Sequence, residues 1–270
     1  MRLATFLAPG SAAPLAGEVR GDQVVAFGGD ETVAGRLASG DRAPATGRAF
    51  AVADVELLAP VPRPGAIYGI GLNYAAHAAE SGAEPPEAPI VFTKVTTASA
   101  PPGGPVRCPE AVRRLDYEGE LVVVVGAAGA AGGFAVADDV SARDLQRREP
   151  QWTRAKGAAT FCPWGPWITT PEDAGDPEDL RLRTWVNGEL RQDASTDDLI
   201  FGIDALLEFL GQTQALEPGD LILTGTPSGV GFAMDPPRFL GDGDVVRIEI
   251  EGLGAIEHAI AAPAAPSAGR

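Results

Sequence analysis

The stretch Asp116-Tyr-Glu-Gly-Glu-Leu-Val-Val-Val-Val-Gly126 decides the fold of this chain. One Leu and four Val in a row, ended by a glycine, are typical of a buried β-strand. Residues two apart in a strand point to the same face, so Glu118 and Glu120 are expected side by side at the edge of that strand. Adjacent carboxylates repel, and a proton or a divalent ion such as Mg²⁺ relieves the repulsion. The alternative is an exposed, polar start of the strand.

Further strand-like segments surround this stretch, whereas convincing helices are few. One predicted helix spans residues 141–149, where Ser141 and Asp144 have the spacing of a capping box, and another spans 197–210, with apolar residues at helical spacing. Many strands and few helices predict a β-dominated α+β fold. The strand-like segments are 67–70, 90–93, 121–125, 181–186, 221–224 and 245–250.

The first 60 residues form a separate predicted region. Short strand patterns occur at 3–7, 23–27 and 52–58, and the alternating prolines of 60–65 favour an extended connector. The predicted units are a small β-rich N-terminal domain over 1–60, a larger domain over 65–260 and a frayed tail over 261–270.

Composition excludes several classes of partner. The 270 residues contain 37 Asp plus Glu against 21 Lys plus Arg, a formal net charge of −16. This charge repels phosphate backbones and anionic lipids, so we expect no nucleic-acid or membrane binding. Two distant cysteines, Cys108 and Cys162, form no disulfide framework, and the sequence contains no apolar run long enough for a signal peptide or a membrane helix. These features predict a cytoplasmic protein.

A third carboxylate close to Glu118 and Glu120 would favour a metal site. Asp138 and Asp139 are both candidates, and the residues alone do not choose between them. Arg143 and Gln146, three apart, share one face of a helix and could together hold a carboxylate. They could equally be ordinary polar surface residues.

Two further segments carry candidate groups. His77 and Glu80 are three apart, so on a short helix the carboxylate can orient the imidazole as a general base, although such pairs are also common on surfaces. His258, in a C-terminal strand, is expected at the surface. The glycine-rich loop 224–231 lacks the lysine of a phosphate-binding loop and offers Thr226 to a ligand, or is simply a tight turn.

Six segments, in this order, together resemble the fumarylacetoacetate hydrolase family over roughly residues 65–255. They are Gly-Leu-Asn-Tyr-Ala-Ala-His-Ala-Ala-Glu (71–80), Asp-Tyr-Glu-Gly-Glu-Leu-Val-Val-Val-Val-Gly (116–126), Asp-Val-Ser-Ala-Arg-Asp-Leu-Gln (139–146), Trp-Thr-Arg-Ala-Lys (152–156), Val-Asn-Gly-Glu-Leu-Arg-Gln-Asp (186–193) and Leu-Thr-Gly-Thr-Pro-Ser-Gly-Val-Gly (223–231). The resemblance implies a mixed β-sandwich roll with a small N-terminal domain, usually assembled as a homodimer.

The resemblance also implies roles for individual residues. It places Asp139, rather than Asp138, with two glutamates around Mg²⁺ or Mn²⁺, with Ca²⁺ an option in a crystal. Lys156 is implied as a catalytic lysine by the resemblance alone. The implied sets are the metal ligands Glu118, Glu120 and Asp139, the catalytic residues His77, Glu80 and Lys156, and the substrate-binding residues Arg143, Gln146 and Thr226.

One segment departs from the family pattern. Related sequences commonly read Ser-Phe-Asp after the lysine, whereas this chain reads Gly157-Ala158-Ala159. We expect this loss of a hydroxyl, a ring and a carboxylate to enlarge and depolarise the wall beside Lys156, and so to change the choice of substrate and the rate of turnover.

The implied activity is metal-dependent hydrolysis of a carbon–carbon bond in a 1,3-diketo acid, giving a 2-keto acid and a carboxylic acid. An acylpyruvate is one substrate type; segments 191–198 and 235–240 resemble those of members that act on diketo sugar acids. One alternative is decarboxylation or keto–enol isomerisation of a 2-oxo diacid at the same site. A catalytically weak homologue used for binding is another.

Overall fold

The structure, a computed structural model, describes residues 1–262 and consists mainly of β-strands. A twelve-stranded mixed sheet follows the path β4-β3-β2-β1-β14-β12-β11-β17-β6-β7, with β5 on β1 and β8 on β14. Its strands are β1 (Arg2–Leu7), β2 (Pro14–Arg20), β3 (Gln23–Ala26), β4 (Ala49–Ala51), β5 (Glu56–Leu57), β6 (Ile67–Gly71), β7 (Ile90–Lys94), β8 (Ser99–Ala100), β11 (Gly119–Val125), β12 (Ala131–Asp138), β14 (Cys162–Thr169) and β17 (Leu221–Leu223). The predicted β-dominated α+β class is confirmed.

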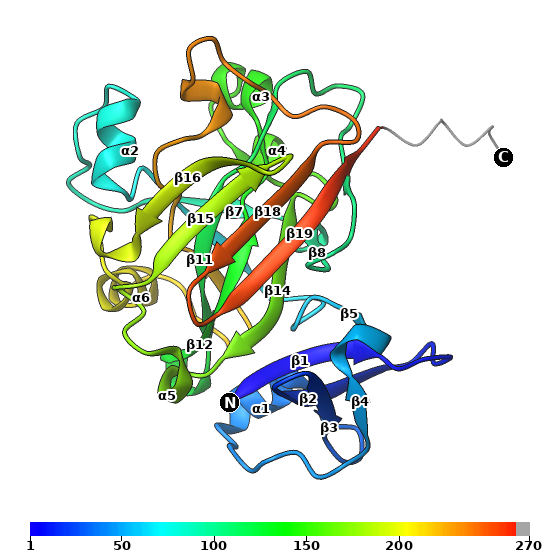
Figure 1. The fold of residues 1–270 in the computed structure, drawn as a ribbon. Helices are drawn as coiled ribbons and strands as arrows, with labels where there is room; N and C mark the ends of the chain where they lie inside the picture. Colours follow the sequence, from blue (N-terminus) through cyan, green and yellow to red (C-terminus); the bar gives the residue numbers. More distant parts are fainter. Residues whose placement is uncertain (263–270) are drawn as a thin grey trace, which may run out of the picture.

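A second sheet packs in front of the middle of the first in the view of Figure 1. Its order is β16-β15-β18-β19-β9. On β18, Val246, Ile248 and Ile250 are buried whereas Val245 is exposed, the alternation of a sheet that covers the core with one face. These strands are β9 (Val106–Arg107), β15 (Arg181–Val186), β16 (Glu189–Ser195), β18 (Val245–Ile250) and β19 (Gly254–Ala261).

Strand β11 occupies the centre of the large sheet. It pairs antiparallel with β12 on one side and with β17 on the other, and it also contacts β15 of the second sheet. All seven of its residues are buried, which explains why its sequence is a continuous apolar run rather than an alternating one. The buried strand predicted from the opening stretch is therefore present.

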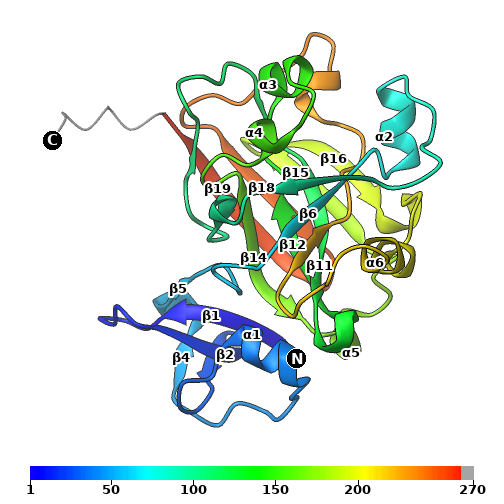
Figure 2. The same ribbon diagram turned by 180° about the vertical axis from the view of Figure 1, so that it is seen from behind.

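The helices are short and connect the strands. Helices α2, α3 and α4 lie at one end of the molecule in both Figure 1 and Figure 2. The helices are α1 (Val33–Ser39), α2 (Ala75–Glu80), α3 (Arg143–Arg148), α4 (Thr153–Lys156), α5 (Pro171–Ala174) and α6 (Ile203–Gly211), with 3₁₀ turns η1 (Val52–Asp54), η2 (Thr96–Ala98), η3 (Ala127–Gly129), η4 (Thr196–Asp198) and η5 (Gly231–Ala233). A two-stranded ladder joins β10 (Leu115–Asp116) to β13 (Ser141–Ala142).

The N-terminal strands β1–β5 lie at the opposite end of the molecule from α2 and α3 (Figure 2). They have an apolar cluster of their own, built around Phe6. Nevertheless, β1 pairs with β14, placing Leu3 opposite Ile168, so one sheet runs through both parts of the chain. The Thr5 hydroxyl also donates to the carbonyl of Pro60 at 2.6 Å. The division into domains at residues 60–65 stays a prediction.

Two predicted helices begin later than expected. Helix α3 begins at Arg143, because Ser141 belongs to β13 and donates its hydroxyl to the Asp139 carbonyl at 2.8 Å instead of capping the helix. The predicted helix 197–210 is divided into η4 and α6. Asn73 holds the chain between them: its Nδ2 donates to the Phe201 carbonyl at 3.0 Å and its Oδ1 accepts from the Phe201 N–H at 2.8 Å.

Other differences concern strands and the tail. The predicted strand at 52–58 is shortened to β5, because Val52–Asp54 form the turn η1. The segments that form β2, β12, β14 and β16 were not among the predicted strands. Ala261 ends β19, and the predicted tail beyond residue 262 lies outside the described residues. Over residues 1–262, no helix has the length and apolar character needed to cross a membrane.

Candidate metal centre

The structure brings three carboxylates together where β11 meets β12. Glu118 immediately precedes β11, Glu120 is its second residue, and Asp139 immediately follows β12. One oxygen of each lies within 4.8 Å of the others, and all three side chains are buried. The antiparallel pairing of Gly119 with Asp138 brings the three carboxylates together, because it sets the start of β11 beside the end of β12.

The chemistry of this cluster fits a divalent ion. Carboxylate oxygens are the ligands that Mg²⁺ and Mn²⁺ prefer. Burial raises the pKa of Glu120 well above its ordinary value, and the charges of Asp139 and Glu118 raise it further. A divalent cation would offset the repulsion among the three carboxylates. Glu118, Glu120 and Asp139 are therefore the residues that would hold a metal.

Two lysines contact the same carboxylates. The Nζ of Lys156 donates to Oε2 of Glu118 and Oδ2 of Asp139, each at 2.6 Å, and Lys94 donates to the other Asp139 oxygen. Burial alone would raise the pKa of Glu118, but the charges of Arg143 and Lys156 outweigh it and hold that pKa far below its ordinary value. Burial disfavours the Lys156 cation, yet Asp139 and Glu118 raise its pKa, so Lys156 is positively charged.

Lys94 was not found by sequence analysis. It ends β7, and its side chain is fully buried against Asp139. A lysine at the end of a strand usually points to water, so the sequence contains no signal for this contact.

Helix α2 carries His77 and Glu80, and His77 lines the same cavity as Glu118 and Glu120. The separation of three residues between His77 and Glu80 puts Nδ1 of His77 3.1 Å from Oε2 of Glu80, as the helical spacing predicts. The other Glu80 oxygen accepts from the Gly229 N–H at 2.9 Å, so the carboxylate is fixed on both sides. His77 is 8% exposed and borders the cavity that Glu118 and Glu120 also line.

Arg143 is held by acids rather than free for a ligand. Its Nε donates to Oδ2 of Asp116 at 2.8 Å, its Nη2 lies 2.6 Å from Oε1 of Glu118, and its Nη1 donates to Oε1 of Gln146 at 2.9 Å. Asp116 also accepts backbone N–H groups from Gly231 and Phe232 at 2.9 and 3.0 Å. The sequence predicted that Arg143 and Gln146 share a helix face, but not that they bind each other or that Asp116 holds Arg143. Burial raises the pKa of Asp116 in spite of Arg143.

The glycine-rich loop after β17 supports the cluster from another side. Gly225 has a φ of +104°, which favours glycine, and its N–H donates to Oε2 of Glu120 at 2.7 Å. The Thr226 hydroxyl donates to the Gly119 carbonyl at 3.0 Å and accepts from Nε2 of Gln192 at 2.8 Å. Thr226 thus lies at the site, and Gln192, which sequence analysis did not consider, holds it.

These groups line one cavity of about 280 Å³. Apolar walls from Ile70, Leu72, Phe92, Trp152 and Phe232 surround them. Of the predicted site residues, those in the lining are His77, Glu118, Glu120, Arg143, Gln146, Lys156 and Thr226, while Asp139 and Glu80 contact members of that set. A larger, open hollow of about 750 Å³ bordered by Arg2 and Trp167 shares no residue with this cavity and contains none of these groups.

The expected effect of the Gly157-Ala158-Ala159 segment on the wall beside Lys156 stays a prediction. None of the segment's residues belongs to the lining of this cavity. The Gly157 N–H donates to the Thr153 carbonyl at 2.8 Å, a helical hydrogen bond that makes Gly157 the C-cap of α4 directly after Lys156. The cavity wall beside Lys156 is instead Phe92, whose ring centroid lies 5.0 Å from the lysine Nζ.

His258 is buried, contrary to the sequence-based expectation. It is 2% exposed, and its Nε2 lies 3.0 Å from Oδ2 of Asp138. Ile256 and Ile260, two residues away on either side, are also buried, so the alternation of β19 turns His258 inward. That alternation was readable from the sequence. Asp138 serves a purpose other than that of Asp139: its Oδ1 accepts the Glu118 backbone N–H at 2.8 Å.

Comparison with known proteins identifies the family. The profile described as "Fumarylacetoacetate (FAA) hydrolase C-terminal" matches residues 66–261. The chain belongs to the fumarylacetoacetate hydrolase family. This confirms the resemblance seen in its six motifs and identifies the chain as a member of a family of enzymes that act on small keto acids.

Relatives within this family differ in the activity for which they are named. The oxaloacetate tautomerase YisK of Bacillus subtilis is 42% identical over 225 residues, which cover 78% of this chain and 75% of YisK. The structure of 2-hydroxyhepta-2,4-diene-1,7-dioate isomerase from Mycobacterium marinum has 36% identity and a TM-score of 0.81, covering 97% of this chain and 98% of that one.

A hydrolase shares the same fold. The structure of maleylpyruvate hydrolase from Sphingobium sp. SYK-6, in complex with manganese(II) ion and pyruvate, has 28% identity and a TM-score of 0.77 and covers 98% of this chain and 100% of that one. Family membership therefore supports isomerisation at least as well as the hydrolysis that the sequence analysis placed first.

Proposed function

We propose that this protein is a metal-dependent keto–enol tautomerase of a small 2-oxo diacid of the oxaloacetate class. The observation that carries the proposal is one cavity in which a single imidazole base, His77, faces a cluster of buried cations and carboxylates. Tautomerisation needs only this: a base that moves one proton, and positive charge that stabilises an enolate. The tautomerase relatives support the same choice.

A divalent ion held by Glu118, Glu120 and Asp139 supplies Lewis-acid stabilisation of the substrate's carboxylate and carbonyl oxygens when it is bound. Lys156 keeps its positive charge beside these oxygens, because its pKa is raised by the neighbouring carboxylates. Mg²⁺ and Mn²⁺ both suit such a site.

His77 moves the proton. Its imidazole takes the proton from the carbon next to the carbonyl, the electrons of the C–H bond form the carbon–carbon double bond, and the carbonyl π electrons move onto the oxygen. The proton is then returned to that oxygen to give the enol. Glu80 holds Nδ1 of His77 at 3.1 Å and so directs Nε2 toward the cavity. No water is consumed and no carbon–carbon bond breaks.

The position of Arg147 favours a substrate with two carboxylates. Arg147 lines the cavity, and its guanidinium lies 4.6 Å from the Phe232 ring centroid; among residues 1–262 no carboxylate forms an ion pair with it. We propose that it binds the distal carboxylate of the substrate, while the proximal carboxylate and the carbonyl lie at the acidic cluster. An arginine stacked on an aromatic ring keeps its donors available for this purpose.

The second candidate function is hydrolysis of a 1,3-diketo acid. The observation that favours it is the similarity to maleylpyruvate hydrolase, and the His77–Glu80 pair could activate water as readily as a C–H bond. Decarboxylation of a 2-oxo diacid would use the same groups.

Product analysis separates these activities. Metal-stripped protein is reloaded with Mn²⁺ or Mg²⁺ and mixed with the enol form of oxaloacetate, and the tautomers are followed by absorbance and by NMR. We expect faster, metal-dependent interconversion without a new product. Release of CO₂, or cleavage of an acylpyruvate without any effect on tautomers, would contradict the proposal. Lack of turnover on both substrates would favour a role in binding.

Three further features belong to the proposal. They are assembly as a homodimer, a cytoplasmic location, and the division of the chain into a small N-terminal domain over 1–60 and a larger domain over 65–260. Light scattering on the purified protein measures the first directly, and a monomer at working concentration would contradict it.

A further inference from the structure

We propose that Asp138 and His258 are positioning residues that hold the backbone of Glu118, and with it the geometry of the metal cluster. The inference rests on a buried contact between the two sheets directly behind the cluster. Asp138 ends β12 of the large sheet, and His258 lies on β19 of the second sheet, which crosses β12 in Figure 1.

Asp138 links two of the proposed metal ligands through the backbone. Its Oδ1 accepts the Glu118 N–H at 2.8 Å, and the neighbouring Asp139 N–H donates to the Glu118 carbonyl at 2.9 Å. Both polar groups of the Glu118 backbone are therefore held by consecutive residues of the opposite strand. A rotation of the Asp138 carboxylate would release Glu118 at the point where the β11–β12 ladder ends, after the pairing of Gly119 with Asp138.

His258 faces the other oxygen of that carboxylate. Its Nε2 lies 3.0 Å from Oδ2 of Asp138, and both side chains are fully buried. The contact has the distance of an ion pair without the alignment of a hydrogen bond, and within residues 1–262 that oxygen has no hydrogen-bond partner. His258 is thus the polar group that keeps the Asp138 carboxylate turned toward Glu118. A buried carboxylate without such a neighbour is strongly disfavoured.

A purely structural role would look different from a positioning role. If the pair only joins the sheets, its loss lowers stability and leaves metal affinity unchanged. If it positions Glu118, metal affinity falls as well, as it does when groups that orient metal ligands are removed. Asp220 provides a matched control. It is a buried carboxylate that accepts the Ala66 and Glu217 N–H groups at 2.7 and 3.0 Å. Its neighbour Leu221 pairs with Val124, at the other end of β11.

The test measures Mn²⁺ affinity by calorimetric titration of the metal-stripped full-length chain, together with its melting temperature. We expect Asp138→Ala and His258→Leu to raise the Mn²⁺ Kd by about tenfold or more. Asp138→Asn should stay within about threefold of the wild type, because its amide still accepts from Glu118 and can donate to a neutral His258. Asp220→Ala should lower the melting temperature at an unchanged Kd.

Several outcomes would overturn the inference. These are an unchanged Kd in Asp138→Ala, an equal loss of affinity in Asp220→Ala, or a loss in Asp138→Asn as large as in Asp138→Ala, which would indicate a charge effect. If Asp138→Ala does not fold, the contrast between His258→Leu and Asp138→Asn decides. A wild type that binds no Mn²⁺ would overturn both the metal centre and this inference, whereas Mn²⁺ binding without tautomerase activity would overturn the proposed function alone.

Discussion

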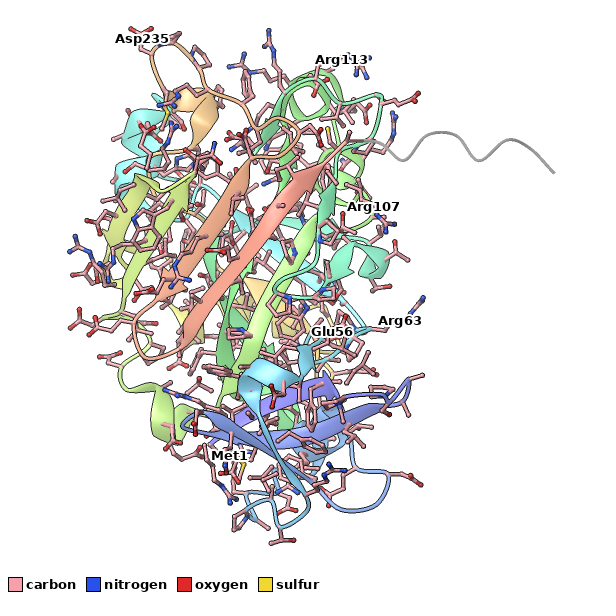
Figure 3. All side chains as sticks on the ribbon, turned by 45° about the vertical axis from the view of Figure 1, so that its right-hand side comes forward. Met1, Glu56, Arg63, Arg107, Arg113 and Asp235 are labelled. Carbon is pink, nitrogen blue, oxygen red and sulfur yellow. The ribbon has the colours of Figure 1, made fainter. Side chains whose placement is uncertain are left out.

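The two ends of the molecule are built on opposite principles. In Figure 3, Met1 lies at the end formed by the N-terminal strands and Asp235 at the tip of a loop at the other end. The N-terminal end has a small apolar cluster in which Phe6 is fully buried. Its ring packs edge-on against that of Phe50, with 5.7 Å between the ring centroids. Burying such a side chain contributes about 1.5–3 kcal/mol to folding.

The site end buries charge instead. Glu118, Asp139, Lys94 and Lys156 all lie at 5% exposure or less, although removing charges from water is costly. The chain balances most of them in pairs, and Glu120 is the carboxylate whose charge remains unfavourable. Apolar burial therefore stabilises this fold, whereas the site retains charges that are useful only once a metal and a substrate bind.

Replacing Glu120 should have the largest effect on function. Because loss of groups that merely orient metal ligands costs about 10–100-fold in affinity, we expect Glu120→Gln to weaken Mn²⁺ binding by at least about 100-fold and to abolish metal-dependent turnover. Calorimetric titration of Mn²⁺ into the metal-stripped variant measures this. An unchanged Kd would show that the ion lies elsewhere.

The same variant should make the metal-free protein more stable. The pKa of Glu120 is raised from 4.5 in the folded state, so the folded protein holds a proton that the unfolded chain releases, and its stability falls as the pH rises above about 4.5. Glu120→Gln removes this loss, so its advantage in melting temperature over the wild type should grow with pH. Glu118→Gln is the control: it breaks buried ion pairs and should destabilise the metal-free protein by about 3 kcal/mol.

Replacing His77 should slow the reaction without affecting the metal. General-base catalysis contributes about 10²–10⁴-fold, so His77→Asn should lower kcat by a factor in this range. The Mn²⁺ Kd should stay nearly unchanged, because within residues 1–262 His77 forms its hydrogen bond with Glu80 and none with the three carboxylates. Glu80→Gln, which keeps a hydrogen-bond acceptor for Nδ1, should show a smaller loss. Equal kcat in His77→Asn and the wild type would remove the proposed base.

Truncating Phe6 tests the other end of the molecule. Phe6→Ala should lower the free energy of unfolding by about 3–5 kcal/mol, as deletion of a buried ring does. Urea denaturation measures the change, and the Mn²⁺ Kd below the transition should equal that of the wild type. A higher Mn²⁺ Kd would show that a change at β1 alters the site through the pairing of β1 with β14.

The smallest expected effect concerns Arg147. Losing one charge-assisted hydrogen bond costs about 1.5–3 kcal/mol, so Arg147→Met should raise KM for a 2-oxo diacid by about tenfold or more. Its KM for a 2-oxo monoacid should not change. Arg148→Met is the matched control, because Arg148 is 69% exposed and does not line the cavity. An equal change with both substrates would exclude Arg147 as the ligand of the distal carboxylate.

Local sequence patterns predicted much of the fold. Arg181–Val186 and Val245–Ile250 are strands with the expected bounds, because alternation and β-branching are local properties. Helix starts were less predictable: Ser141 looked like a cap, yet its hydroxyl bonds to Asp139 in a two-residue strand. Strands such as β14, with Pro163, Gly165 and Pro166, carry no such pattern.

Part of the site was also determined by the sequence alone. A spacing of two along a strand and of three along a helix placed Glu118 beside Glu120 and His77 beside Glu80. The periods of strand and helix fix such neighbours whatever the rest of the chain does. Only the tertiary structure decided which further groups join them: Lys94 at the end of β7, and His258 of the second sheet, which lies against Asp138. These contacts depend on strand order and register, which result from the packing of the whole chain and not from local spacing.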